Sequence, residues 1–185
     1  NSPGAPWLVR SYAATTQRYD YDYFNARLTP VATFPGFSGD CTSMSTNNVY
    51  RISGIAIITG SVNCENKNLV IFVDGDLRID GNFTPTPGAI AFIVRDAINI
   101  HGAVTSIRAI LLQSSSTARF DTVYTGPVTS ALAATGSWIS FGGFDLDRRV
   151  VGGGPSETIS HDPQMLLSLT DVLGQSSFYW QEVAP

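Results

Sequence analysis

The sequence predicts an all-β protein that forms a right-handed parallel β-helix, or β-solenoid. Two similar stretches, NLVIFVDGDLRIDGNFT (68–84) and AIAFIVRDAINIHGAVT (89–105), are the basis of this prediction. Each has a continuous apolar run, a polar break, a short alternating run and a glycine, so that Gly102 follows Gly81 by 21 residues. The connections are too short for crossover helices, so parallel pairing requires the chain to coil.

The two kinds of apolar run predict two kinds of strand. Continuous runs are typical of strands buried on both faces, whereas alternating runs indicate one wet face. A third copy of the repeat is less regular, with an apolar run at Ile107–Leu112, and a fourth surrounds Trp138. An antiparallel β-sandwich containing two similar hairpins is the alternative fold. The continuous runs are Leu69–Val73 and Ile90–Val94, and the alternating ones are Leu77/Ile79 and Ile98/Ile100.

Three regions are expected along the chain. Residues 1–48 form an irregular N-terminal arm, residues 49–154 the solenoid core, and residues 155–185 a capping helix and strand. Within the arm, Tyr19, Tyr21 and Tyr23 alternate with Asp20 and Asp22, and this period of two is strand-like.

The C-terminal region has a helix signature. Asp162 suits the N-cap and Pro163 the first helical position, while Gly174 is placed to end the helix. The predicted helix of about 11 residues would cover one end or side of the solenoid. The stretch SSFYWQEVAP then predicts a final strand anchored by Phe178 and Trp180.

These stretches carry a family resemblance. The motif N-L-V-I-F-V-x-G-x-L-x-I, the segment HDPQMLLSL and the ending Y-W-Q-E-V-A-P resemble predicted surface or secreted β-solenoid proteins of uncultured bacteria. In that poorly characterised family a Y/H-D-P-x-x-L-L segment and a closing W-x-E-V-x-P likewise follow glycine-punctuated strands. The resemblance covers roughly residues 64–185, and it implies an exported structural or surface role without catalytic residues.

Composition narrows the class of protein. Only 14% of the 185 residues are charged, the net charge is −4, and there is no basic run, which argues against nucleic-acid binding. No apolar stretch reaches the length that spans a bilayer. The chain starts without Met, which suggests a processed form. Cys41 and Cys64 predict one disulfide in an exported protein, the alternative being two free thiols.

Candidate chemistry is sparse. Asp74, Asp76 and Asp80 could serve glycan cleavage together with His101, or could bind calcium by themselves. Turn formation by the DGD sequence is the stronger interpretation, because Gly takes positive φ and Asp caps turns. We therefore expect no enzymatic activity, no cofactor and no metal. Asn82 begins one glycosylation sequon, which is a weak signal.

The expected function is mechanical: a secreted, extracellular or cell-surface subunit of a self-assembling filament or layer, joined head to tail as a homopolymer. The alternative is an adhesin or carbohydrate-binding module that uses the aromatic arm or an aromatic last turn (Trp138, Phe141, Phe144), with glycans or other cell-surface proteins as partners. The aromatic residues expected at an assembly interface are Trp7, Tyr12, Tyr19, Tyr21, Tyr23, Phe24, Phe178 and Trp180.

Overall fold

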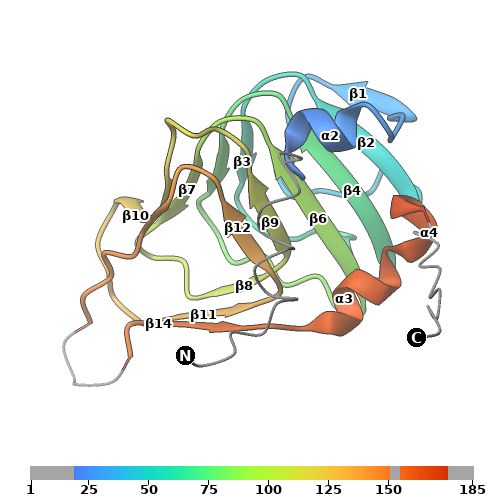
Figure 1. Ribbon diagram of the computed structural model, residues 1–185. Coiled ribbons are helices and arrows are strands. Elements are labelled where there is room, and N and C mark those ends of the chain that lie inside the picture. The colour runs from blue at the N-terminus through green and yellow to red at the C-terminus, as the bar shows by residue number, and fades with distance from the viewer. Residues whose placement is uncertain (1–18, 151–154, 175–185) are drawn as a thin grey trace, which may run out of the picture.

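The computed structural model describes residues 19–150 and 155–174. The strands wind as a β-solenoid in three parallel sheets, so the predicted fold class is confirmed and the sandwich is not (Figure 1). The first sheet has the order β1 (Ala32–Phe34), β2 (Asn48–Ile52), β4 (Lys67–Val73), β6 (Gly88–Val94), β9 (Ile110–Gln113) and β12 (Trp138–Ser140). The second comprises β3 (Ala56–Ile58), β5 (Leu77–Ile79), β7 (Ile98–His101), β10 (Phe120–Thr125) and β13 (Phe144–Asp145). The third comprises β8 (Ser106–Arg108), β11 (Leu132–Thr135) and β14 (Glu157–Ser160).

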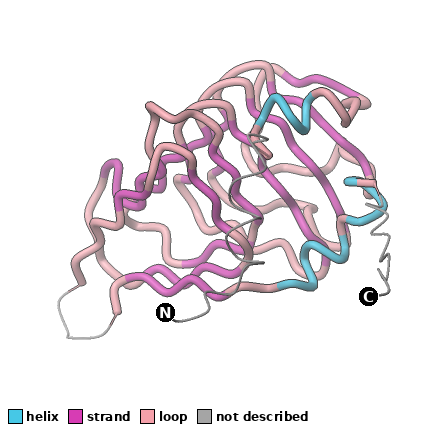
Figure 2. The backbone as a smooth tube through the Cα atoms, viewed as in Figure 1, coloured by secondary structure: helices cyan, strands magenta, loops and turns pink. Residues whose placement is uncertain are grey.

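The sequence repeat corresponds to one turn of the solenoid. Val73 of β4 pairs with Val94 of β6, and Ile79 of β5 pairs with Ile100 of β7. Asp76 and Ala97 are also 21 residues apart. In the turn between the sheets, the Asp76 carboxylate accepts a hydrogen bond from the Ala97 N–H. Figure 2 shows strands stacked in this way, with the loops gathered at the corners.

The continuous apolar runs are buried on both faces of the first sheet. Side chains that point inward, such as Ile71 and Phe92, join one core inside the solenoid. Their neighbours Val70 and Ile93 point outward into a second cluster, which the helices cover. In the second sheet β5 alternates, with Leu77 and Ile79 buried and Arg78 between them partly exposed. Both predicted strand types are therefore present.

Two short helices cover the lower part of the first sheet in Figure 1. These are α3 (Pro163–Ser168) and α4 (Thr170–Leu173), separated at Leu169, where the sequence predicts a single helix. The predicted start is confirmed, because Asp162 caps α3 by accepting from the Gln164 N–H. Met165, Leu169 and Val172 pack against the sheet, so the helices cover the side of the solenoid rather than an end.

The tyrosine-rich stretch is a helix, α2 (Tyr21–Asn25), and the expected strand is wrong. Asp20 accepts a hydrogen bond from the Tyr23 N–H at 3.1 Å and thereby caps the helix. A lone alternating stretch cannot reveal this, because its conformation depends on the sheet that it packs against.

The solenoid also extends beyond the region expected for it. β1 lies inside the predicted arm and pairs with β2 in the first sheet, while β14 lies inside the predicted C-terminal cap and pairs with β11. The third copy of the repeat, expected as one run over Ile107–Leu112, is divided between β8 and β9, which belong to different sheets. The expected final strand, with Phe178 and Trp180, lies outside the described residues.

Candidate functional site

The residues of the DGD sequence hold the turns together. The Asp74 carboxylate accepts a hydrogen bond from the Tyr21 hydroxyl, which connects α2 to the sheet. Asp76 Oδ1 accepts from the Ala97 N–H at 2.9 Å and so caps the following turn. Both aspartates therefore have structural partners, as the turn interpretation predicts. Its expectation of positive φ at the glycine is wrong, because Gly75 has no positive φ.

Asp80 belongs to a different cluster, on the outer side of the second sheet. Its carboxylate accepts from Arg78 at 2.9 Å and from the Tyr124 hydroxyl at 3.1 Å. Burial and the hydrogen bond to Asp80 raise the pKa of Tyr124. The His101 ring lies 6.5 Å from the Tyr124 ring, and its Nδ1 accepts from the Ala103 N–H at 3.1 Å. Across the described ranges, no group of three or more His, Cys, Asp or Glu is arranged to hold a metal ion.

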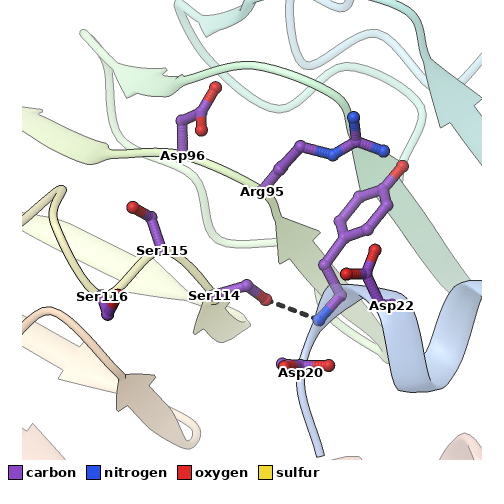
Figure 3. A pocket seen from close by; sticks show the side chains of 8 residues that line it. Asp20, Asp22, Arg95, Asp96, Ser114, Ser115 and Ser116 are labelled. Carbon is purple, nitrogen blue, oxygen red and sulfur yellow. Dashed lines mark hydrogen bonds between the residues drawn. The ribbon is translucent and has the colours of Figure 1, made fainter.

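A polar cleft of about 460 Å³ opens beside α2 (Figure 3). Arg95 and Asp96 follow β6, and the hydroxyls of Ser114–Ser116 follow β9. Because carboxylates, hydroxyls and one guanidinium line the cleft, it offers hydrogen-bond donors and acceptors to a hydroxyl-rich ligand. The lining residues are Asp20, Tyr21, Asp22, Arg95, Asp96, Ser114, Ser115 and Ser116.

Tyr21 forms the inner wall of this cleft and anchors α2. Its backbone N–H donates to Ser114 Oγ at 2.6 Å, and its ring lies edge-on to Phe72 at 5.2 Å. The Arg95 guanidinium lies over the same ring, 4.5 Å from its centroid. Burial, with a further contribution from Asp74, raises the pKa of Tyr21 to about 12.

The predicted interface aromatics have different environments. Tyr21 is only 1% exposed and belongs to the second core cluster of its own chain, whereas Tyr19 is 57% exposed. Tyr23 packs edge-on against both Tyr19 and Phe24. Trp7, Tyr12, Phe178 and Trp180 lie outside the described residues, so their assignment to an interface stays a prediction.

The aromatic last turn is mostly a stack inside the solenoid. The Trp138 ring stacks on Phe120 with centroids 4.8 Å apart, and Phe144 lies 5.0 Å from the same ring. Phe144, in the edge strand β13, is still 38% exposed. Phe141 packs on the outer face of the first sheet with the helix-covered cluster. These aromatics therefore do not form one flat platform for a sugar.

The predicted disulfide between Cys41 and Cys64 is confirmed, with Cα atoms 5.0 Å apart and both residues fully buried. It joins the first turn to the second beside the bridge between Asp40 and Val62. Lys67, the only lysine, donates to the backbone carbonyls of Cys41 and of Met44, which also ties the first turn down. The N-terminal end of the solenoid is thus cross-linked both covalently and by hydrogen bonds.

Asn82, the sequon residue, has a structural role in the corner between turns. Its side-chain oxygen accepts from the Thr105 N–H at 2.9 Å and from the Ser106 N–H at 3.1 Å. Its Nδ2 donates to Thr105 Oγ1 at 3.2 Å, so a glycan on that atom would replace this hydrogen bond.

Exposed apolar side chains concentrate in the end turns of the solenoid. Among the described residues, none of the exposed large hydrophobic side chains lies between Val62 and Ile139, which spans the central turns. Sequence reasoning singled out Tyr19 and Phe144 among these residues and missed the others, although the atypical end copies of the repeat were a signal. Four lie in the first two turns (Val31, Ile55, Ile57, Val62), four in the last turn (Ile139, Phe144, Leu146, Ile159), and three on or beside the helices (Tyr19, Leu166, Leu167).

Comparisons with known proteins identify no relative: no family model matches the chain, and no curated protein or solved structure is significantly similar to it. Of the helices in the described ranges, none has the length and apolar character needed to cross a membrane.

Proposed function

We propose that this chain is a non-enzymatic extracellular structural protein whose solenoids join head to tail into a filament or layer. The supporting observation is that eight of the eleven exposed large apolar side chains in the described residues lie in the first two turns or the last turn. Apolar patches on an otherwise polar surface mark interaction sites. Because the two ends carry different residues, their contact is heterologous, and a heterologous contact that does not close produces a fibre.

The sheet edges agree with this proposal. β12, β13 and β14 each pair with a strand on one side only, so in the described structure the last turn leaves backbone groups available. At the other end, Pro30 and Pro35 bracket β1 and lack N–H donors. We therefore expect side-chain packing, rather than a long continuous sheet, to form most of the junction.

The disulfide and the resemblance to predicted exported β-solenoid proteins support an extracellular location. The alternative function, an adhesin or carbohydrate-binding module, is favoured by the polar cleft beside α2, whose lining suits a hydroxyl-rich ligand. The two functions differ in what the purified protein does alone, because only the first requires self-association.

Light scattering over a concentration series, followed by electron microscopy, tests the assembly. We expect the wild type to form fibres, and Leu146→Glu with Ile159→Glu to abolish them by placing charge in the junction. Leu167→Glu is the matched control: its side chain is similarly exposed, but it lies on α3 and should leave assembly intact. A 19.8 kDa monomer at every concentration would contradict the proposal and move attention to glycan binding at the cleft.

A further inference from the structure

An apolar groove lies on the outer face of the first sheet, between α2 on one side and α3 and α4 on the other. Its volume is about 100 Å³, and every residue that lines it is apolar. Two of these side chains are open to solvent, Ile139 at 45% and Leu166 at 41%. Other lining residues are Phe24 of α2, Ile110 and Leu112 of β9, and Leu169.

The course of α2 brings the preceding chain to this groove. The Tyr21 N–H donates to Ser114 Oγ, just beyond β9, whereas Asn25 at the other end of α2 bonds Arg51 of β2. The helix therefore crosses the sheet from β9 towards β2. The start of α2 therefore lies on the side of β9, whose Ile110 and Leu112 line the groove, and Figure 1 shows α2 lying across the first sheet.

The sequence before Tyr19 contains one segment that matches the groove chemically. Trp7, Leu8 and Val9 are the only run of three large apolar residues among residues 1–18. Trp7 lies twelve positions before Tyr19, a reach of up to about 40 Å when extended. An apolar cavity of about 150 Å³ takes a benzene molecule, so a groove of about 100 Å³ suits one aliphatic side chain or part of an indole.

We propose that the Trp7–Val9 segment occupies this groove in its own chain. Because α2 already holds the chain against the same sheet, the segment's effective concentration at the groove is in the millimolar range, and a second copy would have to compete with it. The segment then covers Ile139 and Leu166, and it leaves Phe144, Leu146 and Ile159 of the last turn, with the exposed residues of the first two turns, available to other molecules. This assignment differs from the intersubunit role that the aromatic composition of the arm favours, and it does not depend on whether the protein assembles.

Cross-linking of dilute protein tests the assignment. The variant Arg10→Cys with Leu167→Cys places one thiol beside the segment and one beside the groove, while the native cysteines stay in their disulfide. A short bismaleimide should join the two thiols within one chain. The pair Arg10→Cys with Ile57→Cys is the control, since Ile57 belongs to the second sheet and is 38% exposed. Adding Trp7→Ser and Leu8→Ser to the first pair should slow cross-linking at least tenfold.

Intrachain cross-linking that favours Leu167→Cys and depends on Trp7 and Leu8 supports the assignment. Cross-links formed only between chains would overturn it and give the groove to a second copy. Equal rates for the two pairs, or rates that the serine substitutions leave unchanged, would also overturn it, because the segment would then have no preferred place on the sheet.

Discussion

Tyr21 is the single residue that best connects the arm to the solenoid. Its backbone, ring and hydroxyl make separate contacts, with Ser114, Phe72 and Asp74 respectively. A tyrosine hydroxyl that is buried against a carboxylate holds its proton more strongly, which explains the direction of its pKa shift. The free energy of unfolding should therefore fall as the pH rises above the ordinary pKa of tyrosine.

We expect Tyr21→Phe to lower the free energy of unfolding at pH 7 by about 1.5–3 kcal/mol, because a hydrogen bond to a charged group is lost. The wild type should also lose about 2 kcal/mol between pH 10 and pH 12. In that window the unfolded tyrosine ionises at its ordinary pKa, while the folded one stays protonated up to about 12. Urea unfolding at pH 7, 9.5 and 11.5, with brief incubation, measures both effects.

Tyr23→Phe is the matched control, since it keeps a ring on α2 and leaves the hydroxyl of Tyr21 in place. It should follow the wild type at every pH. If Tyr21→Phe lost the same stability between pH 10 and pH 12 as the wild type, the alkaline loss would belong to other groups.

Neighbouring residues of one type show why sequence alone could not place every side chain. Arg148 and Arg149 are adjacent and chemically identical, yet Arg148 is 5% exposed and Arg149 is exposed. Arg148 donates to the carbonyls of His101 and Gly102 at 3.0 Å, and burial lowers its pKa. Only the path of the last turn decides which arginine reaches those carbonyls, and no local pattern records that path.

Among the elements, the strands of the repeat were predictable and the helix of the arm was not. β4 and β6 could be predicted because their apolar runs are long and recur at one spacing, and that spacing is the register between turns. α2 has only five residues, and its position depends on contacts with distant strands. The cleft could not be predicted for the same reason, because it lies between α2 and the corners that follow β6 and β9.

The repeated glycines allow successive turns to approach closely. A Cβ atom on Gly81 would lie 2.0 Å from the carbonyl oxygen of Thr59 in the preceding turn. On Gly60, by contrast, a Cβ would meet nothing within 4 Å. The glycine after β5 is therefore required by the stacking of backbones and not by a special φ.

Gly81→Ala should consequently destabilise the protein by about 3 kcal/mol, because two backbone segments must move apart. For a chain of this size that loss lowers Tm by roughly 6–12 °C. Thermal unfolding followed by circular dichroism gives the value. Gly60→Ala serves as the control and should change Tm by no more than about 2 °C; an equal fall in both variants would show that the close contact with Thr59 is not the cause.

For the molecule as a whole, the two ends are the surfaces that distinguish one direction along the solenoid from the other. The N-terminal end carries a disulfide and Lys67 to hold its first turn, whereas the C-terminal end presents three strand edges. Coiling was predictable from the repeat, since coiling alone accommodates such short links. The chemistry of the ends was not, because end turns depart from the repeat that makes the rest recognisable.

A filament with unlike ends should be sensitive to a subunit that is blocked at one of them. Val31→Glu with Val62→Glu charges the N-terminal end and leaves the C-terminal end able to join. Such a subunit can join a fibre through its C-terminal end, and growth then stops at that end of the fibre. A few per cent of it should therefore shorten wild-type fibres severalfold in electron micrographs.

A subunit that also carries Leu146→Glu and Ile159→Glu is blocked at both ends and should have no effect on fibre length. Equal shortening by both variants would indicate nonspecific interference rather than termination at one end.

The constant register between β4 and β6 has a consequence for evolution and for engineering. Since Asn68 pairs with Ala89 and Val73 with Val94, the chain from 68 to 88 is one turn-length module. A duplicate of it keeps glycine at the position of Gly88, where a Cβ would lie 2.5 Å from the Lys67 carbonyl oxygen. Each added copy would lengthen the rod by about 4.8 Å and leave both terminal surfaces unchanged. The length of such a protein can therefore change only in steps of one turn, according to the number of repeats that the gene encodes. It can change without altering the surfaces at the two ends.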